Sequence, residues 1–142
     1  MKFLTASTAI ALATCAVATT FTASYDTTYD AGSTSLNTVA CSDGPNGLET
    51  RGYTTFGSIP SFPYIGGAPQ ITGWNSPYCG SCWEITYGTT TIHMTAIDVG
   101  DAAREGFNLS EEAMNALTGG QAASLGRVSV TATQVAASVC GL

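Results

Sequence analysis

Residues 76–83, Ser-Pro-Tyr-Cys-Gly-Ser-Cys-Trp, contain a Cys-x-x-Cys pair formed by Cys79 and Cys82. Such a pair occurs in redox sites, in metal sites and as part of disulfide frameworks. The three alternatives imply different compartments and different classes of function. Which one applies depends on the other cysteines of the chain and on whether the chain is exported.

The N-terminus has the pattern of a secretory signal peptide. A lysine supplies one positive charge, an apolar and small-residue run follows, and Ala16 and Ala18 provide the small residues that a signal peptidase accepts at positions −3 and −1. Cleavage after Ala23 is less favoured, because the bulky Phe21 would then occupy position −3. We therefore expect residues 1–18 to be removed and the mature chain to be secreted.

Removal of this leader changes the cysteine count. Cys15 and the only lysine leave with it, so four cysteines remain and the formal charge moves from −6 to −7. In an oxidising exterior an even number of cysteines pairs, here with three possible connectivities. A zinc site is disfavoured because a second close-spaced ligand pair is missing, and a redox site because no βαβ pattern surrounds the motif. The four cysteines are Cys41, Cys79, Cys82 and Cys140.

The composition describes one domain, residues 19–142, with an uncharged polar surface. Charged residues make up 10% of the chain, against roughly 25% in ordinary soluble domains. The only cations of the mature chain are Arg51, Arg104 and Arg127, so no basic patch could neutralise phosphates. Nucleic acid and anionic membranes are therefore poor partners, and an uncharged partner such as a polysaccharide suits the composition better. No later stretch is apolar for 18 residues, and the mature protein should be soluble.

Local patterns predict three strands and one helix. Residues 82–87 and 90–98 alternate apolar and polar side chains around Gly88, as in a hairpin, and residues 127–135 form the clearest half-buried strand. A helix begins after the N-cap Ser110 and ends before Gly119. Too few helices exist for the crossovers of a parallel sheet, so a compact β-barrel is favoured over an α/β fold.

Two further segments are expected to be ordered loops. Residues 41–48 gather Gly, Pro, Asp and Asn, which requires a tight loop, and residues 56–74 carry many Gly and Pro among apolar residues that need burial. Residues 19–40 are rich in Thr and Ser, with Tyr-Asp pairs that are typical of strand ends or turns.

Among the acids, Asp98 is the main candidate for a functional role. It closes a predicted strand and precedes a loop at Gly100, where a side chain can point into a groove, although a turn aspartate is an equally good interpretation. Asp43 lies in a Gly-rich turn and fits an Asx-turn. His93 is the only histidine and alternates with strand residues, so we expect it to be solvent-facing or hydrogen-bonded. Neither a metal site nor a cofactor site is indicated.

Aromatic side chains and one sequon bear on carbohydrate binding. Trp74, Trp83, Tyr25, Tyr29, Tyr78 and Phe107 could stack on sugar rings, but core packing is the more frequent role of such residues. Asn108-Leu109-Ser110 fits the N-glycosylation sequon, and a glycan there would argue against a binding groove at this place.

Short motifs with compatible order and spacing cover nearly the whole mature chain. They are Ser24-Tyr25-Asp26, Val39-Ala40-Cys41-Ser42-Asp43-Gly44, Gly47-Leu48, Phe62-Pro63, Ile65-Gly66-Gly67, Ile71-Thr72-Gly73-Trp74, residues 76–83 and Gly106-Phe107-Asn108. Together they resemble the cerato-platanins, a family of small secreted fungal proteins.

The resemblance implies a six-stranded double-psi β-barrel related to expansins and barwin-like endoglucanases, with one or two short helices and long disulfide-linked loops. It also implies disulfides between Cys41 and Cys79 and between Cys82 and Cys140. Each bridge would close a long loop, worth roughly 4 kcal/mol as an upper estimate from chain entropy. The Cys-x-x-Cys pair would then be structural.

The family binds chitin and N-acetylglucosamine oligomers in a shallow groove, loosens cellulosic material without clear hydrolysis, and elicits plant defence. Asp98 would match the retained aspartate of the expansin-like groove. The segment 98–106 departs from the shorter, glycine-rich form of relatives, which bears on the width of the groove. The residues that would line or shape the groove with Asp98 are Tyr25, Asp26, Ser42, Asp43, Asn46, Gly47, Leu48, Gln70, Gly106, Phe107 and Asn108.

Three hypotheses follow for the function. The first is a non-catalytic binder of chitin or related wall glycans, without cofactor or metal. The second is a weak endoglucanase that uses Asp98 and another carboxylate, since glycosidases normally need two. The third is a surface-active coat protein of the cell wall. We expect a monomer with possible assembly at interfaces, wall polysaccharide as partner, and a host plant receptor as a further partner.

Overall fold

The computed structural model describes residues 3–4, 6–12 and 18–142. Residues 1–2, 5 and 13–17 of the predicted leader, Cys15 among them, lie outside the described residues. The described leader residues form neither helix nor strand, and Phe3 and Leu4 are 91% and 97% exposed. The first strand begins at Thr19, directly after the predicted cleavage site, which itself stays a prediction.

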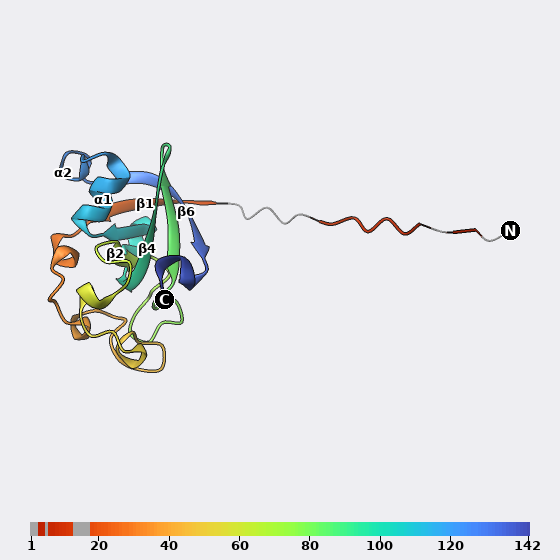
Figure 1. Ribbon diagram of the computed structural model, residues 1–142. Helices are drawn as coiled ribbons and strands as arrows, with labels where there is room; N and C mark the ends of the chain where they lie inside the picture. Colours follow the sequence, from red (N-terminus) through yellow and green to blue (C-terminus); the bar gives the residue numbers. More distant parts are fainter. Residues whose placement is uncertain (1–2, 5, 13–17) are drawn as a thin grey trace.

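Six strands within the described residues close into a barrel in the order β1-β5-β2-β4-β3-β6 (Figure 1). The pairs β1·β5 and β2·β4 are parallel, and the other four pairs are antiparallel. Closure leaves no unpaired sheet edge. The predicted six-stranded barrel is therefore confirmed. The strands are β1 (Thr19–Tyr25), β2 (Ile65–Ala68), β3 (Cys82–Tyr87), β4 (Thr90–Val99), β5 (Gly106–Leu109) and β6 (Val128–Val135).

The strands predicted from local alternation are all present. β3 and β4 form the expected hairpin, in which Trp83 lies opposite Met94 and Ile85 opposite Ile92. In β6 the side chains of Val128, Val130 and Ala132 are buried, while Ser129 and Thr131 are exposed. The period of two in these segments thus arises because one face of each strand packs on the core and the other face is exposed to water.

The other three strands, β1, β2 and β5, do not stand out in the sequence. β2 reads Ile-Gly-Gly-Ala, and glycine normally weakens a strand. Here both glycines are required, because a Cβ at Gly66 would collide with the Asn108 carbonyl oxygen and a Cβ at Gly67 with that of Val99. The segment interpreted from sequence as an ordered loop therefore contains a strand that two neighbouring strands approach closely.

Two short helices, α1 (Glu111–Thr118) and α2 (Ala122–Leu125), lie together at one end of the barrel (Figure 1). The predicted N-cap is confirmed, since the Ser110 hydroxyl accepts a hydrogen bond of 3.1 Å from the Ala113 amide. A second cap comes from Asp30, whose carboxylate accepts from the Glu111 and Glu112 amides at 2.8 and 3.0 Å. Neither helix is long and apolar enough to cross a membrane, as far as the described residues go.

Six 3-10 helices shape the connections around the barrel. They are η1 (Thr27–Asp30), η2 (Leu36–Thr38), η3 (Glu49–Arg51), η4 (Phe56–Ser58), η5 (Ala102–Arg104) and η6 (Ala137–Cys140). Four of them lie between β1 and β2, so the region expected to be loop is built from short single turns.

The barrel interior and the two disulfides hold these loops in place. Phe21, Trp83 and Phe107 pack edge to face with ring centroids 5.3–6.4 Å apart. The disulfides Cys41–Cys79 and Cys82–Cys140 confirm the pairing that the family resemblance implies. Cys79 and Cys82 therefore belong to different bridges, and the Cys-x-x-Cys pair is neither a redox couple nor a metal clip.

Candidate functional site

A polar groove lies where β4 ends and β1 and β5 run side by side. Its volume is about 290 Å³. The regions 24–29, 98–108 and the single residue 127 contribute to it, and both acidic and basic side chains reach it. The lining residues are Ser24, Tyr29, Asp98, Val99, Gly100, Asp101, Asn108 and Arg127.

The carboxylate of Asp98 is held in a fixed orientation in this groove. Its Oδ2 accepts a hydrogen bond of 2.9 Å from the Tyr29 hydroxyl. Its Oδ1 accepts from the amides of Ala40 and Val99 at 3.1 and 2.8 Å. Burial, followed by the charge of Asp98, raises the pKa of Tyr29 far above its ordinary value, so the phenol remains a donor. Asp98 is thus an oriented acceptor rather than a mobile surface acid.

Asn108 and Ser24 form the polar wall beside Asp98. They lie opposite each other in the parallel pair β1·β5, and the Ser24 hydroxyl donates to Asn108 Oδ1 at 3.2 Å. Asn108 also begins the sequon, but its Ser110 is fully buried and donates to the Pro63 carbonyl. Asn108 and Asp98 line the same groove.

Arg127 and Asp101 were not expected at the site. Arg127 donates to Thr22 Oγ1 at 2.8 Å and to Asp101 Oδ2 at 2.9 Å, and so ties β1, the start of β6 and the loop after β4 together. The loop itself is closed by two backbone hydrogen bonds between Asp101 and Gly106. The only sequence signal was that Arg127 is one of three cations in residues 19–142.

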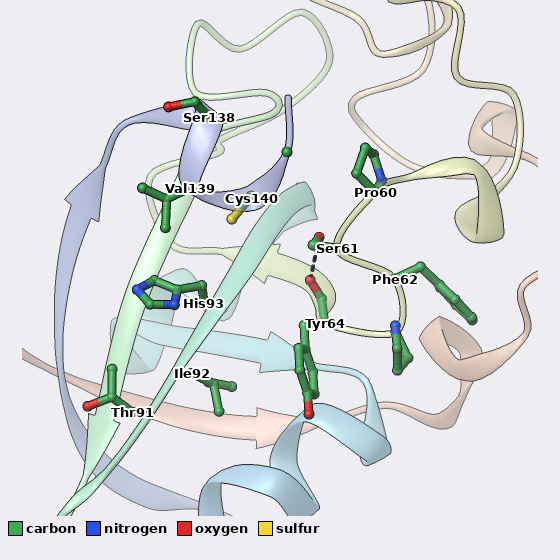
Figure 2. A pocket seen from close by; sticks show the side chains of 12 residues that line it. Pro60, Ser61, Phe62, Tyr64, Thr91, Ile92, His93, Ser138, Val139 and Cys140 are labelled. Atoms are coloured by element: carbon green, nitrogen blue, oxygen red, sulfur yellow. Dashed lines mark hydrogen bonds between the residues drawn. The ribbon is translucent and has the colours of Figure 1, made fainter.

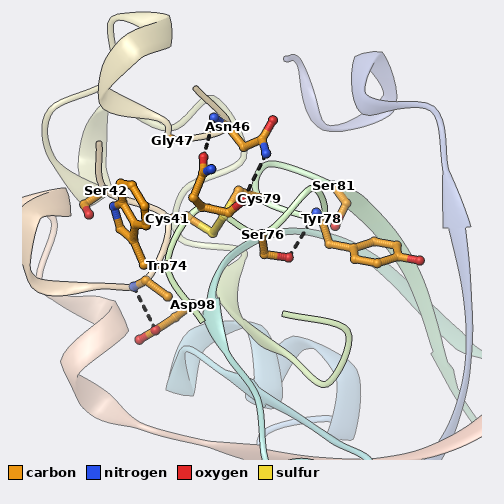
Figure 3. The surroundings of a disulfide bond; sticks show 12 residues. Cys41, Ser42, Asn46, Gly47, Trp74, Ser76, Tyr78, Cys79, Ser81 and Asp98 are labelled. Carbon is orange, nitrogen blue, oxygen red and sulfur yellow. Dashed lines mark hydrogen bonds between the residues drawn. A yellow bond between two sulfur atoms is a disulfide. The ribbon is translucent and has the colours of Figure 1, made fainter. Parts of the chain in front are cut away.

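A second cluster gathers around Trp74 and contains other predicted residues. The Trp74 indole Nε1 donates to Asp43 Oδ1 at 2.7 Å, and the Ser42 hydroxyl donates to the same oxygen at 3.3 Å. The Trp74 hydrogen bond, foremost, lowers the pKa of Asp43 below its ordinary value. Asn46 forms two hydrogen bonds with Asn75, of 2.9 and 3.0 Å (Figure 3). The Asx-turn interpretation of Asp43 thus misses its bond to a distant tryptophan.

The remaining predicted residues divide by burial. Leu48 and Phe107 are fully buried, so they shape the site from behind and their side chains are not available to a ligand. Gly47 and Gly106 are buried too. Asp26 is exposed, but its carboxylate caps η1 through the Thr28 amide at 2.8 Å. Tyr25 and Gln70 are half-buried, and Gln70 Oε1 has no hydrogen-bond partner among the described residues.

A larger hollow of about 710 Å³ lies elsewhere and includes none of the twelve predicted residues. Figure 2 shows Thr91, His93 and Val139 on one side of it and Pro60, Phe62 and Tyr64 on the other. His93 Nε2 lies 3.0 Å from Glu84 Oε2, so the expectation of a hydrogen-bonded histidine is confirmed. In the smaller groove, the one lined by Asp98, hydrogen bonds hold several polar side chains in fixed positions. Polar groups in fixed positions are what orients a ligand in a binding site.

The described residues contain no group of three or more His, Cys, Asp or Glu side chains that could hold a metal ion. Two carboxylates, Asp98 and Asp101, do reach the groove. Each makes its observed hydrogen bonds as an acceptor, Asp101 Oδ2 from Arg127 and, at 3.3 Å, from Arg104. The arrangement can therefore accept hydrogen bonds from hydroxyl and amide groups of a neutral ligand.

Fold and site define a small disulfide-bonded barrel protein with a shallow polar groove. The family model for cerato-platanin matches residues 21–142. The chain belongs to the cerato-platanin family.

Individual relatives agree with this assignment. The heat-stable 19 kDa antigen of Coccidioides immitis (strain RS) is 49% identical over 126 residues, which are 89% of this chain and 84% of that protein. The crystal structure of cerato-platanin 2 from M. perniciosa superimposes with a TM-score of 0.82 at 47% identity, over 87% of this chain and all of that one. The solution structure of the fungal elicitor cerato-platanin gives a TM-score of 0.73 at 42% identity, over 84% and 95% of the two chains.

Proposed function

We propose that this protein is a secreted, non-catalytic binder of chitin and N-acetylglucosamine oligomers, and that the Asp98 groove is its binding site. The observation that carries the proposal is the fixed carboxylate of Asp98 beside Asn108 and Ser24. A carboxylate has about four acceptor positions on its two oxygens. Three are taken by Tyr29, Ala40 and Val99, which leaves one on Oδ2 for a hydroxyl or amide of a sugar.

The ligand should be neutral. The groove contains two carboxylates and one guanidinium, and the whole chain carries a formal charge of −6, so an anionic polysaccharide would be repelled. N-acetylglucosamine offers hydroxyls and an amide that match an oriented carboxylate and an amide side chain. A groove of about 290 Å³ holds part of an oligomer and leaves the rest on the surface.

Binding is favoured over hydrolysis because a glycosidase needs one protonated acid as well as a base or nucleophile. Asp101 is the second carboxylate of the groove, but it is bonded to Arg127 and Arg104 rather than standing free across from Asp98. A weak endoglucanase using Asp98 remains the alternative. New reducing ends released from a soluble glucan, and abolished by Asp98→Asn, would support that alternative.

Wall loosening and defence elicitation follow as consequences of glycan binding. A protein that binds chain segments competes with the contacts between neighbouring chains, and needs no bond cleavage to do so. One relative is titled a fungal elicitor, and we extend that role to this chain, with a host plant receptor as partner. Secretion is supported by the two disulfides, which persist in oxidising compartments.

Surface activity is a second candidate function. Several large apolar side chains of the barrel region are exposed, and Trp74 and Val139 are more than half exposed. Such side chains lower the cost of placing a protein at an air–water interface. Film formation that survives Asp98→Asn would separate this property from binding in the groove.

The direct test is a titration of 15N-labelled protein, residues 19–142, with the tetramer of N-acetylglucosamine. We expect saturable amide shifts at Ser24, Asp98 and Asn108, and clearly weaker binding by Asp98→Asn. Glu112→Gln, on α1 and not among the residues that line the groove, removes one negative charge as a matched control and should bind like wild type. Amide chemical shifts around Asp98 that stay unchanged at high tetramer concentration would disprove the proposal.

A further inference from the structure

We propose that the exposed indole of Trp74 is a stacking platform for one pyranose ring of a neutral wall glycan, and that it forms a contact separate from the Asp98 groove. This inference rests on the proposed function and names a contact within it. Trp74 does not line the groove, and its side chain is 61% exposed. A large aromatic ring left in water is unusual for a residue whose default role is core packing.

The ring is held in place rather than left free. Its Nε1 donates to Asp43 Oδ1 at 2.7 Å, a bond shortened by the charge of the acceptor. Gly44 lies against the ring: its φ is +84°, and an added Cβ would stand 2.8 Å from Trp74 Cζ2. Because Gly44 has no side chain, the indole can pack against the backbone of this loop, and the exposed part of the ring faces solvent.

The two loops that carry this arrangement are tied together on both sides. The Cys41–Cys79 disulfide joins the segment before Asp43 to the segment after Trp74 (Figure 3). Asn46 and Asn75 add two hydrogen bonds between the same loops. A ring that is already oriented loses little conformational entropy when a ligand binds, which is the main cost of recruiting a surface side chain.

The chemistry favours a neutral sugar as occupant. The C–H face of a pyranose ring is weakly positive and apolar, and it complements the negative face of an indole π-system. The Asp43 carboxylate beside the ring disfavours anionic glycans. A cationic group would also be attracted to such a ring, which makes a cation the competing occupant that the test must exclude.

The platform and the groove are close enough for one oligomer. The Ala40 amide is bonded to Asp98, and Asp43, which holds Trp74, is three residues further along the chain. Three residues span at most about 11 Å. The backbone at Ala40, which binds Asp98, and the backbone at Asp43, which holds Trp74, therefore lie within a span that an oligosaccharide of a few rings can cover.

The chain offers a direct optical test. It contains two tryptophans, of which Trp83 is only 5% exposed, so acrylamide quenching of the intrinsic fluorescence reports on Trp74. The tetramer of N-acetylglucosamine should reduce quenching of the wild-type protein, and Trp74→Phe should abolish the ligand-sensitive part. By calorimetry, Trp74→Ala should weaken tetramer binding about tenfold. Asp43→Ala, which frees the ring, should weaken binding several-fold, and Asp43→Asn, which keeps an acceptor oxygen, should weaken it less.

Tyr78→Ala is the matched control, because Tyr78 is also exposed and its ring points away from Trp74 in Figure 3. It should bind the tetramer like wild type. If the tetramer binds wild type with unchanged quenching, and equally well to Trp74→Ala, the platform is disproved while the proposed function stands. If no tetramer binds wild type by calorimetry, both fail. If only the deacetylated, cationic tetramer protects Trp74, and salt abolishes the protection, the site binds cations and the inference is wrong.

Discussion

Tyr29 and Asp98 are 69 residues apart in sequence, and the Tyr29 hydroxyl donates a 2.9 Å hydrogen bond to Asp98 Oδ2. Tyr29 lies in η1 directly after the first strand, and Asp98 lies near the end of β4. The bond joins the loop region between β1 and β2 to the barrel at the place where the groove opens. It also fixes the carboxylate on which the proposed binding depends.

Tyr29→Phe is therefore expected to affect stability and binding together. Tyr29 is 6% exposed, and a hydrogen bond to a charged group contributes about 1.5–3 kcal/mol. We expect a loss of about 2 kcal/mol in urea unfolding and several-fold weaker binding of the tetramer. Tyr64→Phe is the control, since the Tyr64 hydroxyl makes no hydrogen bond within the described residues. Equal losses in the two variants would contradict the role of the Tyr29–Asp98 bond.

The salt bridge between Arg127 and Asp101 should matter more than the one between Arg104 and Asp101. The Arg127 side chain is 28% exposed and bonds to both Thr22 and Asp101, whereas the Arg104 side chain is 65% exposed. We expect Arg127→Met to cost about 1–2 kcal/mol in chemical denaturation, and Arg104→Met less than about 0.5 kcal/mol. Arg127→Lys should be about as unstable as Arg127→Met, because the ammonium group of lysine lacks the two guanidinium nitrogens that reach Thr22 and Asp101 together. The reverse ranking of the two arginines would refute this.

Protonation of Asp43 should be visible in the fluorescence of Trp74. The indole hydrogen bond stabilises the ionised form, so the pKa of Asp43 lies below its ordinary value of 3.8. The stabilisation is complete above that ordinary value and is lost as the pH falls through the lowered pKa. We expect Trp74 emission to change with a midpoint below pH 3.8, and no such transition in Asp43→Asn. A transition above pH 3.8 would contradict the assignment.

Each disulfide should contribute substantially to stability. The bridges close loops with sequence separations of 38 and 58 residues, which corresponds to about 4 kcal/mol each in the chain-entropy estimate. We expect the paired substitutions Cys41→Ser with Cys79→Ser, and Cys82→Ser with Cys140→Ser, each to lower the unfolding free energy by several kcal/mol. Urea unfolding of each variant under oxidising conditions measures this. An unchanged midpoint in either variant would refute it for that bridge.

The mature protein should begin at Thr19. All five residues that β1 pairs with β6, Thr19 to Ala23, would be lost if cleavage occurred after Ala23. Intact-mass analysis of the protein secreted from a fungal host gives the N-terminus directly. Among purified chains, residues 19–142 should fold and residues 24–142 should be strongly destabilised, since the barrel would lose most of one strand. A stable chain starting at Ser24 would show that the β1·β6 pairing is dispensable.

Local patterns in the sequence were sufficient for part of the fold. The alternation in β3, β4 and β6 and the Ser110 cap of α1 depend on neighbours in the chain, and all were predicted within one residue at their ends. β2 and β5 escaped detection because each is only four residues long. The two glycines of β2 are dictated by the close approach of neighbouring backbone, whereas Gly106 of β5 lies against the side chains of Arg127 and Thr22. The second cap of α1, Asp30, is 81 residues from its partner and leaves no local signal.

The candidate site, like the fold, could be predicted from the sequence only in part. The sequence by itself, through the family motifs and the four cysteines of residues 19–142, determined the class of protein, the barrel and the disulfide framework, and it indicated Asp98 as a candidate site residue. Only the tertiary structure decided that Tyr29 and two amides hold Asp98, and that Arg127 links Thr22 to Asp101 beside the groove. It also decided that Trp74 lies exposed against Gly44 while Phe107 is buried. The reason is physical: periodicity and capping act between neighbours in the chain, whereas barrel closure and the two bridges bring distant residues into contact.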